Sequence, residues 1–254
     1  MITMASQIKI KKLVDFKSNF LHLSQIKVGK AEEKIVINQT LDQKEININL
    51  DENANLTYIT SYNSFVAHLK KDSILKIYNV VTSQYDATIK GTINLMEKGA
   101  NVEVINLLLC TKNAKLDSFI DIYHYVGHTS SNLTNYAIAK DEAEMTINNN
   151  ATIKHLASSS VAHQQTKGLT LSKSAKIKAL PNLYIDEYDV VANHACSIGS
   201  INKEDLFYLM SRGLDETEAS KIVVMGYVKP ILDHIDDADL KQKIEKEFAK
   251  KLLN

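Results

Sequence analysis

The stretch 181–213, PNLYIDEYDVVANHACSIGSINKEDLFYLMSRG, marks the point where the pattern of the chain changes from extended to helical. In its first half, apolar residues recur at every second position, at Leu183 and Ile185 and again at Val190 and Ala192. This spacing is typical of β-strands, in which successive side chains point to opposite faces. The sequence therefore predicts that the stretch begins with extended structure around acidic turn residues.

A helix is expected directly after these strands. Asn202 offers a side-chain acceptor for the first free amides of a helix, Asp205 follows three residues later as in a capping box, and Gly213 stands where a left-handed C-terminal residue is common. The sequence predicts a helix from about Lys203 to Arg212. The stretch is thus a junction between two kinds of structure.

Short runs with strand-like alternation precede the junction, from about residue 33 to residue 192. Examples are EKIVI (33–37), ININL (46–50), ILKIY (74–78) and NVEV (101–104). No helical period of convincing length interrupts them. The region is therefore expected to be almost entirely β.

A small local pattern recurs within this region, an alanine followed two positions later by an apolar residue. It begins at Ala54, Ala87, Ala100, Ala114, Ala143, Ala151 and Ala175. Small residues at corners, each followed by an inward apolar side chain, suit a parallel β-solenoid, whose coils stack on one another. An antiparallel sandwich is the alternative, but it favours Asn-Gly or Asp-Gly hairpin turns, and the sequence contains neither dipeptide. The pattern favours the solenoid.

Composition limits the classes of partner and compartment. The chain has 254 residues, of which 44% are hydrophobic, and 30 basic residues balance 30 acidic ones. A sizeable core is expected, and no net charge favours nucleic acid or an anionic membrane. The longest apolar run, 104–110, is too short to span a bilayer, and no apolar run follows the N-terminal lysines, so we expect no secretory signal and a cytoplasmic location.

Three segments follow from these patterns: a short N-terminal lead-in (1–30), the parallel β-helix (31–199) and a C-terminal helical subdomain (200–254). In the last segment Asp215 and Glu218 predict a second capping box, and Pro230 should kink or end the helix that it opens. A final helix should begin at Asp236 or Asp237. Its apolar positions are Leu240, Ile244, Phe248 and Leu252.

Cysteine and histidine positions give the candidate metal ligands. Two cysteines are too few for a disulfide framework, and Cys110, at the end of a leucine run, is expected to be a small buried hydrophobe. His124 and His128 have the spacing of helical zinc ligands, but they fall in or just after a strand-like run and no HExxH motif surrounds them. A zinc site is therefore not expected at this pair.

His194 and Cys196 form the stronger candidate, a soft-metal or sulfur site. A neutral imidazole suits iron, and in a strand a thiolate two residues later points to the same side. Small residues flank His194. In the alternative interpretation, His194 only forms hydrogen bonds across the end of the solenoid.

The first predicted helix is the candidate partner-binding element. Leu206, Phe207, Tyr208 and the leucine after them present more apolar surface than one helix face can bury in its own domain. Arg212 is the only arginine in the chain. Because a guanidinium offers a planar fork of donors, we expect Arg212 to hold a carboxylate or backbone carbonyls bidentately.

The stretch 181–219 resembles the C-terminal signature of the SufB/SufD family of iron–sulfur cluster assembly proteins, and the resemblance extends from about residue 163 to residue 227. It implies a right-handed parallel β-helix and places His194 at the subunit interface where the cluster is built. In the B-type branch a glutamate follows this histidine and a functional cysteine stands earlier. This chain has Ala195 and Thr166 at those positions, which indicates the SufD-like branch.

The resemblance implies a non-catalytic, SufD-like subunit that pairs with a SufB-like subunit and docks a SufC-type ATPase. A transient iron–sulfur cluster would lie at the subunit interface, and ATP would bind only to the partner. Two alternatives are a β-solenoid carbohydrate-active enzyme and a homodimeric scaffold without cluster binding. The enzyme needs clustered acids or a carboxylate–arginine set, whereas the acids are scattered and Arg212 lies in the helical segment.

Overall fold

The computed structural model describes residues 11–16, 24–38, 45–61, 64–235 and 238–253. Its strands form two sheets, and all strand pairs are parallel. The 8-stranded sheet, here called the odd sheet, contains in spatial order β1 (Lys11–Phe16), β3 (Glu33–Asn38), β5 (Asn55–Thr60), β7 (Ile74–Ser83), β9 (Asn101–Cys110), β11 (Ser130–Ala139), β13 (Ser160–Thr170) and β15 (Val190–Ser200).

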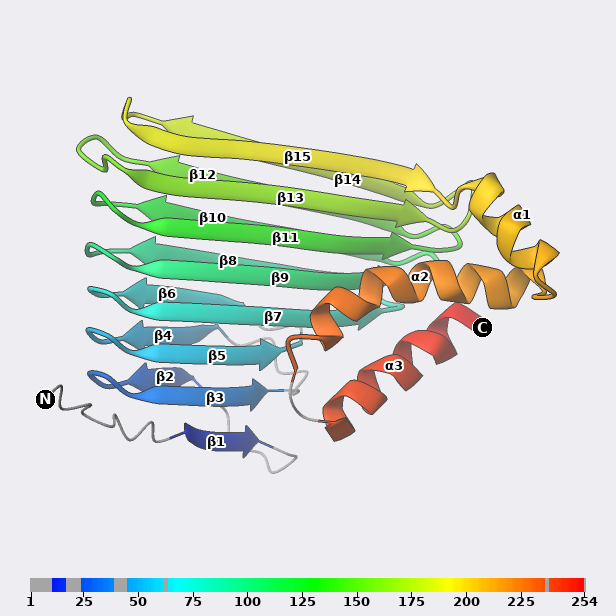
Figure 1. Ribbon diagram of the computed structural model, residues 1–254, viewed down its shortest axis with the longest axis horizontal. Helices are drawn as coiled ribbons and strands as arrows, with labels where there is room; N and C mark the ends of the chain where they lie inside the picture. Colours follow the sequence, from blue (N-terminus) through cyan, green and yellow to red (C-terminus); the bar gives the residue numbers. More distant parts are fainter. Residues whose placement is uncertain (1–10, 17–23, 39–44, 62–63, 236–237, 254) are drawn as a thin grey trace, which may run out of the picture.

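The 7-stranded sheet, here called the even sheet, contains the remaining strands. In spatial order they are β2 (Gln25–Val28), β4 (Ile46–Leu50), β6 (Phe65–Leu69), β8 (Ala87–Leu95), β10 (Lys115–His124), β12 (Glu144–Ile153) and β14 (Lys176–Ile185). Consecutive strands along the chain therefore lie in opposite sheets, and the chain winds upward coil by coil (Figure 1). The predicted parallel β-solenoid is confirmed.

Buried alanines occupy the corners of the coils. Ala54, Ala100, Ala114, Ala143 and Ala175 each stand one residue before a strand, and their side chains are buried. At two of these corners the preceding residue has a positive φ, 58° at Asn53 and 80° at Gly99. A left-handed residue followed by a small inward one turns the chain sharply between the sheets. This is the physical basis of the alanine pattern in the sequence.

The core lies between the two sheets. In β10 every second residue is buried, from Leu116 through His124, which is the alternation of a strand with one face inside. In β9 the last seven residues are all buried, because the outer face of the odd sheet is also covered. Strands covered on both faces read as continuous apolar runs, as the stretch around Leu107 does.

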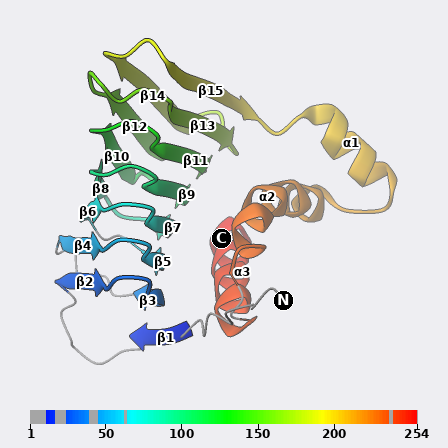
Figure 2. The same ribbon diagram turned by 60° about the vertical axis from the view of Figure 1, so that its left-hand side comes forward.

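Three helices complete the fold: α1 (Lys203–Ser211), α2 (Glu216–Leu232) and α3 (Ala238–Leu253). Helices α2 and α3 lie against the outer face of the odd sheet, and α1 projects away from the stack of coils (Figure 2). Val224, Val228 and Phe248 pack there against sheet residues such as Leu107 and Leu109. None of the described helices has both the length and the apolar character needed to cross a membrane.

A polar contact also holds α3 to the odd sheet. The Thr82 hydroxyl, near the end of β7, donates to the Glu247 carboxylate, and the Lys251 ammonium donates to Thr82 Oγ1 at 2.9 Å. Glu247 and Lys251 also form an ion pair at 3.6 Å. Because Thr82 is only 5% exposed, these bonds fix the last helix on the sheet.

The helix termini agree with the sequence in most details. Asp215 and Glu218 form the predicted capping box at the start of α2, and Gly213 has the expected left-handed conformation, with φ 94°. Asn202 caps α1, but it accepts from the amide of Glu204 at 3.0 Å rather than from that of Asp205. The predicted opening of the last helix at residues 236 and 237 lies outside the described residues.

Pro230 lies inside the last turn of α2, and the helix ends two residues later at Leu232. At the other end of the chain, the segment 1–30 was expected as a lead-in, yet it contains β1 and β2, which pair with β3 and β4. These short runs gain strand partners only from later coils, and local alternation alone does not reveal such partners.

Candidate functional site

The solenoid has an open end. The last strands, β14 and β15, each pair with one neighbour, β12 and β13 respectively, and within the described residues no strand covers their other edges. Even-numbered amides at the two ends of β14 donate toward the β12 side: Lys176 donates to Ala143, just before β12, and Asp186, just after β14, donates to Ile153. Odd-numbered amides of this strand point toward the uncovered edge. Pro181, which has no N–H, occupies an odd-numbered position, so no hydrogen bond to β12 is lost there. Both edges can accept a further strand.

His194 and Cys196 lie on the inward face of β15. Ala192, in the same strand, packs against the interior cluster that contains Ala151 and Ala162. Strand alternation then gives His194 and Cys196 the same direction as Ala192. Both are nevertheless exposed, because no further coil covers this end of the solenoid.

The residues directly below them are buried. In the register of the last two strands His194 pairs with Gln164 and Cys196 pairs with Thr166. Gln164 and Thr166 are 3% and 2% exposed, respectively. The predicted ligands therefore lie over a polar floor inside the solenoid, about 6.6 Å apart along the strand.

A ladder of buried amides leads up to this floor. Asn79 Nδ2 donates to Asn106 Oδ1 at 2.6 Å, and Asn106 Nδ2 donates to Asn135 Oδ1 at 2.7 Å. Asn135 Nδ2 then donates to Thr166 Oγ1 at 3.1 Å. Every N–H donor in this series points toward the open end. The next position in the register is that of Cys196.

Gln164 has one satisfied and one unsatisfied polar atom. Its Nε2 donates to the backbone carbonyl of Asn182, in β14, at 3.3 Å. Its Oε1 is buried and has no hydrogen-bond partner among the described residues. A buried carbonyl oxygen without a donor is uncommon in folded proteins and requires an explanation.

Apolar side chains surround the open end. They are Leu180, Tyr184, Ile185, Tyr188, Val191 and Ile198, with exposed fractions from 36% to 104%. A monomeric surface seldom gathers this many large apolar groups beside two uncovered sheet edges. This end therefore has the character of an interface.

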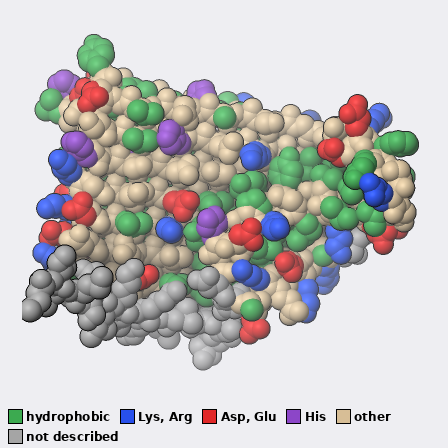
Figure 3. Space-filling model, viewed as in Figure 1, with side chains coloured by type: hydrophobic (Ala, Val, Ile, Leu, Met, Phe, Trp, Pro, Cys, Tyr) green, Lys and Arg blue, Asp and Glu red, His purple; other side chains and the backbone are tan. Residues whose placement is uncertain are grey.

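Helix α1 is a second exposed surface. None of its residues is buried, and the exposed fractions of Phe207 and Tyr208 are 76% and 56%. Figure 3 shows hydrophobic side chains gathered around α1, at the right of the view. Leu206 is partly exposed. Within the described residues, Phe207, Tyr208 and Met210 of α1 are thus exposed, and a docking role for this helix stays a prediction.

Among the described residues, Arg212 contacts an aromatic side chain, and the expected bidentate hold on a carboxylate or carbonyls stays a prediction. Its guanidinium carbon lies 5.1 Å from the ring centre of Tyr208, and one nitrogen donates to the Tyr208 hydroxyl at 3.1 Å. The two residues are four apart across the end of a short helix. An aromatic neighbour on the same face therefore provides the stacking partner.

His124 and His128 lie in different surroundings. His124 is buried inside the solenoid, where Nδ1 lies 2.8 Å from Thr129 Oγ1 and Nε2 lies 2.9 Å from Ser131 Oγ. Burial lowers the pKa of His124 to about 4. His128 stands at a corner with φ 58°. No group of three or more His, Cys, Asp or Glu side chains that could hold a metal occurs among the described residues.

Cys110 is buried, as expected, and its thiol donates to the Ala114 carbonyl at 3.4 Å. Desolvation by burial is the main reason that the pKa of this thiol is raised to about 11, and the negative charge of the nearby Asp86 adds to the effect. Cys110 therefore stays protonated. It is a packing residue rather than a metal ligand.

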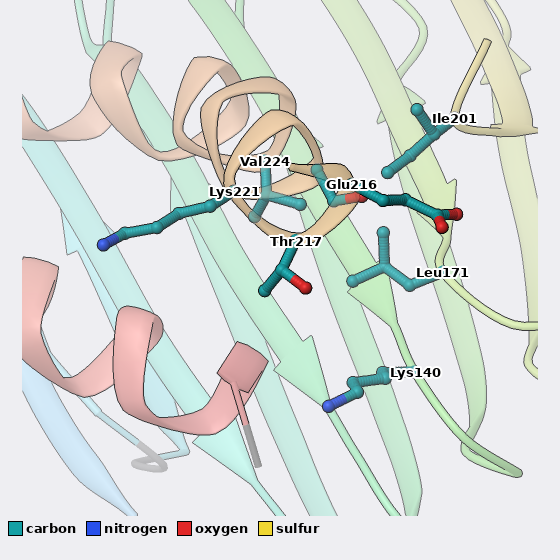
Figure 4. A pocket seen from close by; sticks show the side chains of 8 residues that line it. Lys140, Leu171, Ile201, Glu216, Thr217, Lys221 and Val224 are labelled. Atoms are coloured by element: carbon teal, nitrogen blue, oxygen red, sulfur yellow. The ribbon is translucent and has the colours of Figure 1, made fainter. Parts of the chain in front are cut away.

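A hollow of about 270 Å³ lies where the start of α2 meets the solenoid (Figure 4). None of the residues predicted as ligands or docking residues lines it. Its walls are formed by Lys140, Leu171, Ile201, Glu216, Thr217, Ser220, Lys221 and Val224. The hollow is thus separate from both candidate surfaces.

The buried amide ladder and Gln164 were missed from the sequence. Asn79 and Asn106 each interrupt an apolar run, which is the available signal of an inward polar residue. They are 27 residues apart, and only the strand register shows that they face each other. Sequence spacing alone does not give that register because the coils differ in length.

A protein-family model and several known proteins resemble this chain. A family model described as "SUF system FeS cluster assembly, SufBD core domain" matches residues 31–227. The chain is similar to the iron–sulfur cluster assembly protein SufD of Bacillus subtilis, at 28% identity over 79% of this chain and 48% of that protein. It is also similar to SufD of Escherichia coli, at 22% identity over 81% of this chain and 51% of that protein. The chain thus spans about half the length of these relatives.

Proposed function

The chain belongs to the SufBD core-domain family of the SUF system, on its SufD-like side, and from this premise we propose that it is a non-catalytic subunit of an iron–sulfur cluster assembly scaffold. The observation that carries the proposal is the open end of the solenoid. There His194 and Cys196 face inward and yet are exposed. A partner that covers this end would enclose both side chains in the interface.

The partner that fits this end is a SufB-like subunit. Both uncovered edges, β14 and β15, can pair with strands of a second solenoid, and apolar side chains beside them would be buried. Strand pairing supplies main-chain hydrogen bonds along both sheets at once. We expect a two-solenoid body whose interface lies at the candidate ligands.

The cluster is the cargo of this interface. A neutral imidazole and a thiolate are both suitable ligands for iron, so His194 and Cys196 fit it. Two ligands from one strand are fewer than the four that a typical iron–sulfur cluster site uses. The partner subunit would therefore supply the remaining ligands. The cluster would be bound only while the ligands of both subunits are in place.

Helix α1 is the proposed docking element for a SufC-type ATPase. Phe207 and Tyr208 are large, exposed aromatic groups, the kind of side chain that dominates protein interfaces. Leu206 and Arg212 flank them, the latter stacked on Tyr208. ATP would bind to the partner only, and the complex would work in the cytoplasm.

The test is anaerobic reconstitution of the complex with its SufB-like and SufC-type partners. His194→Ala should leave folding and partner binding intact and should abolish most cluster loading, measured by the visible spectrum and by iron and sulfide content. Cys196→Ala should have a milder effect. Asn193→Ala is the control, because Asn193 is exposed on the opposite face of the same strand.

Full loading by a folded His194→Ala complex would exclude the ligand role. A second copy of this chain could also cover the open end, which gives the homodimeric scaffold as the alternative outcome. Light scattering of the chain alone, and of the chain with its SufB-like partner, distinguishes the two. A homodimer that persists in the presence of the partner, without bound iron, would contradict the proposal.

A further inference from the structure

The unsatisfied oxygen of Gln164 lies in the floor of the candidate site. Gln164 is 3% exposed and points into the solenoid from β13. The residue beside it on the inward face of the next strand is His194. Adjacent strands are about 4.8 Å apart, so a rotation of the exposed imidazole brings a ring nitrogen within reach of the Gln164 side chain.

The orientation of the Gln164 carboxamide is set by its other bond. A backbone carbonyl can only accept a hydrogen bond, so the atom that contacts the Asn182 carbonyl must be the nitrogen of the carboxamide. The oxygen is then the atom left inside the solenoid without a donor. Its desolvation is a cost that any neighbouring N–H would remove.

We propose that Gln164 is a positioning residue for His194: its Oε1 accepts the N–H of one imidazole nitrogen and thereby leaves the other nitrogen bare toward the partner. A histidine that binds a metal commonly donates its second ring N–H to such an acceptor. The bond selects one neutral tautomer and one ring orientation. The direction of the lone pair is then fixed before any partner or iron arrives.

The hydrogen bond itself does not depend on the proposed function, although its use in holding iron rests on it. The measurement is therefore made on the chain alone, without metal. Long-range ¹H–¹⁵N spectra of histidine-labelled protein, at a pH where imidazoles are neutral, give the ratio of the two tautomers of His194. His194→Ala identifies the signals.

Gln164→Met removes the acceptor and keeps a side chain of similar length. We expect the tautomer ratio of His194 to change by about fivefold in this variant, which is the effect of one ordinary hydrogen bond. Gln164→Glu keeps an acceptor oxygen and loses the donor to Asn182, so it should retain the wild-type preference. Gln165→Met is the control, because Gln165 is exposed on the outward face of the same strand.

An unchanged tautomer ratio in a folded Gln164→Met protein would overturn the inference. A change of the same size in Gln164→Glu would also overturn it, because the donor to Asn182 would then be the group that matters. If the ratio changes as expected while the reconstituted His194→Ala complex loads fully with cluster, the positioning role stands and the ligand role of His194 fails. The two proposals are therefore separable.

Discussion

Asn106 donates a hydrogen bond of 2.7 Å to the Oδ1 of Asn135 inside the solenoid, where Asn106 is 1% exposed and Asn135 is fully buried. Replacing Asn135 with leucine leaves the Asn106 amide without its acceptor and removes the donor to Thr166. We expect Asn135→Leu to lower the free energy of unfolding by about 2 kcal/mol, the cost of buried groups without partners. The urea midpoint measures this change.

Asn150→Leu is the matched control for that variant. Asn150 donates to Asp121 at 2.6 Å in a comparable ladder, but on the outer face of the even sheet, where water can replace the lost partner. The expected change is within about 0.5 kcal/mol. Equal losses of unfolding free energy in Asn135→Leu and Asn150→Leu would contradict the view that breaking the interior ladder costs more than breaking the outer one.

His124 makes stability depend on pH. Its pKa is about 4 in the folded protein because burial disfavours the charged ring, whereas the ordinary pKa of a histidine is 6.5. Between these values the unfolded chain binds a proton that the folded chain does not, so the free energy of unfolding falls as the pH falls from about 6.5 to about 4. The full effect is of the order of 3 kcal/mol.

The contribution of His124 is isolated by difference. His124→Gln should be less stable than wild type at pH 7, because the contacts to Thr129 and Ser131 are disturbed, and its stability should change less between pH 6.5 and pH 4. Thermal melts of both proteins across this range are the measurement. Parallel pH profiles would show that His124 titrates normally in the folded state.

The docking role of α1 is tested by removing its exposed aromatic groups. Phe207→Ala together with Tyr208→Ala should weaken association with a SufC-type ATPase by about 2 to 4 kcal/mol, as for hot-spot residues, and should leave the melting temperature nearly unchanged. Calorimetric titration gives the affinity. The control is Lys246→Ala, at an exposed position of α3, and an unchanged affinity in the double variant would exclude the role.

Arg212→Lys distinguishes stacking from charge. The lysine keeps the positive charge, whereas the planar contact with Tyr208 is lost. Because both side chains are exposed, we expect the free energy of unfolding to change by less than about 0.5 kcal/mol, and the effect should fall on ATPase affinity. Wild-type affinity in Arg212→Lys would show that the guanidinium has no special part in docking.

Thr82 tests how the last helix is held. Thr82→Val keeps the shape of the side chain and removes the hydroxyl bonds to Glu247 and Lys251. The expected loss is about 1 to 2 kcal/mol, with faster proteolysis of the helical segment. Thr88→Val, an exposed threonine in β8, is the control.

Local signals predicted most of the fold. The capping pair Asp215 and Glu218 lies within one turn, and the corner alanines act within their own coils, so the sequence alone identified α2 and the solenoid. His194 and Cys196 were correctly expected on one side of a strand, because strand alternation is a local property. Their role as ligands stays a prediction.

Features that depend on the register between coils were not predictable. Gln164 and His194 are 30 residues apart, and their pairing requires the lengths of the corners between β13 and β15. The same applies to the partners of Asn79 and Asn106. Among the described residues Arg212 contacts Tyr208, a neighbour that its fork of donors also suits, and its bidentate hold on a carboxylate or carbonyls stays a prediction.

Burial differs greatly between the middle and the end of the odd sheet. Seven successive residues of β9 are buried, whereas nine of the eleven residues of β15 are exposed and the other two are partly exposed. In a stack where each coil contacts only its neighbours, amides exchange with solvent first where local opening costs least. The last coil should therefore open and close many times before the central coils unfold once. A subunit that meets its partner through such a coil can adjust the strand positions at the contact without unfolding its own core.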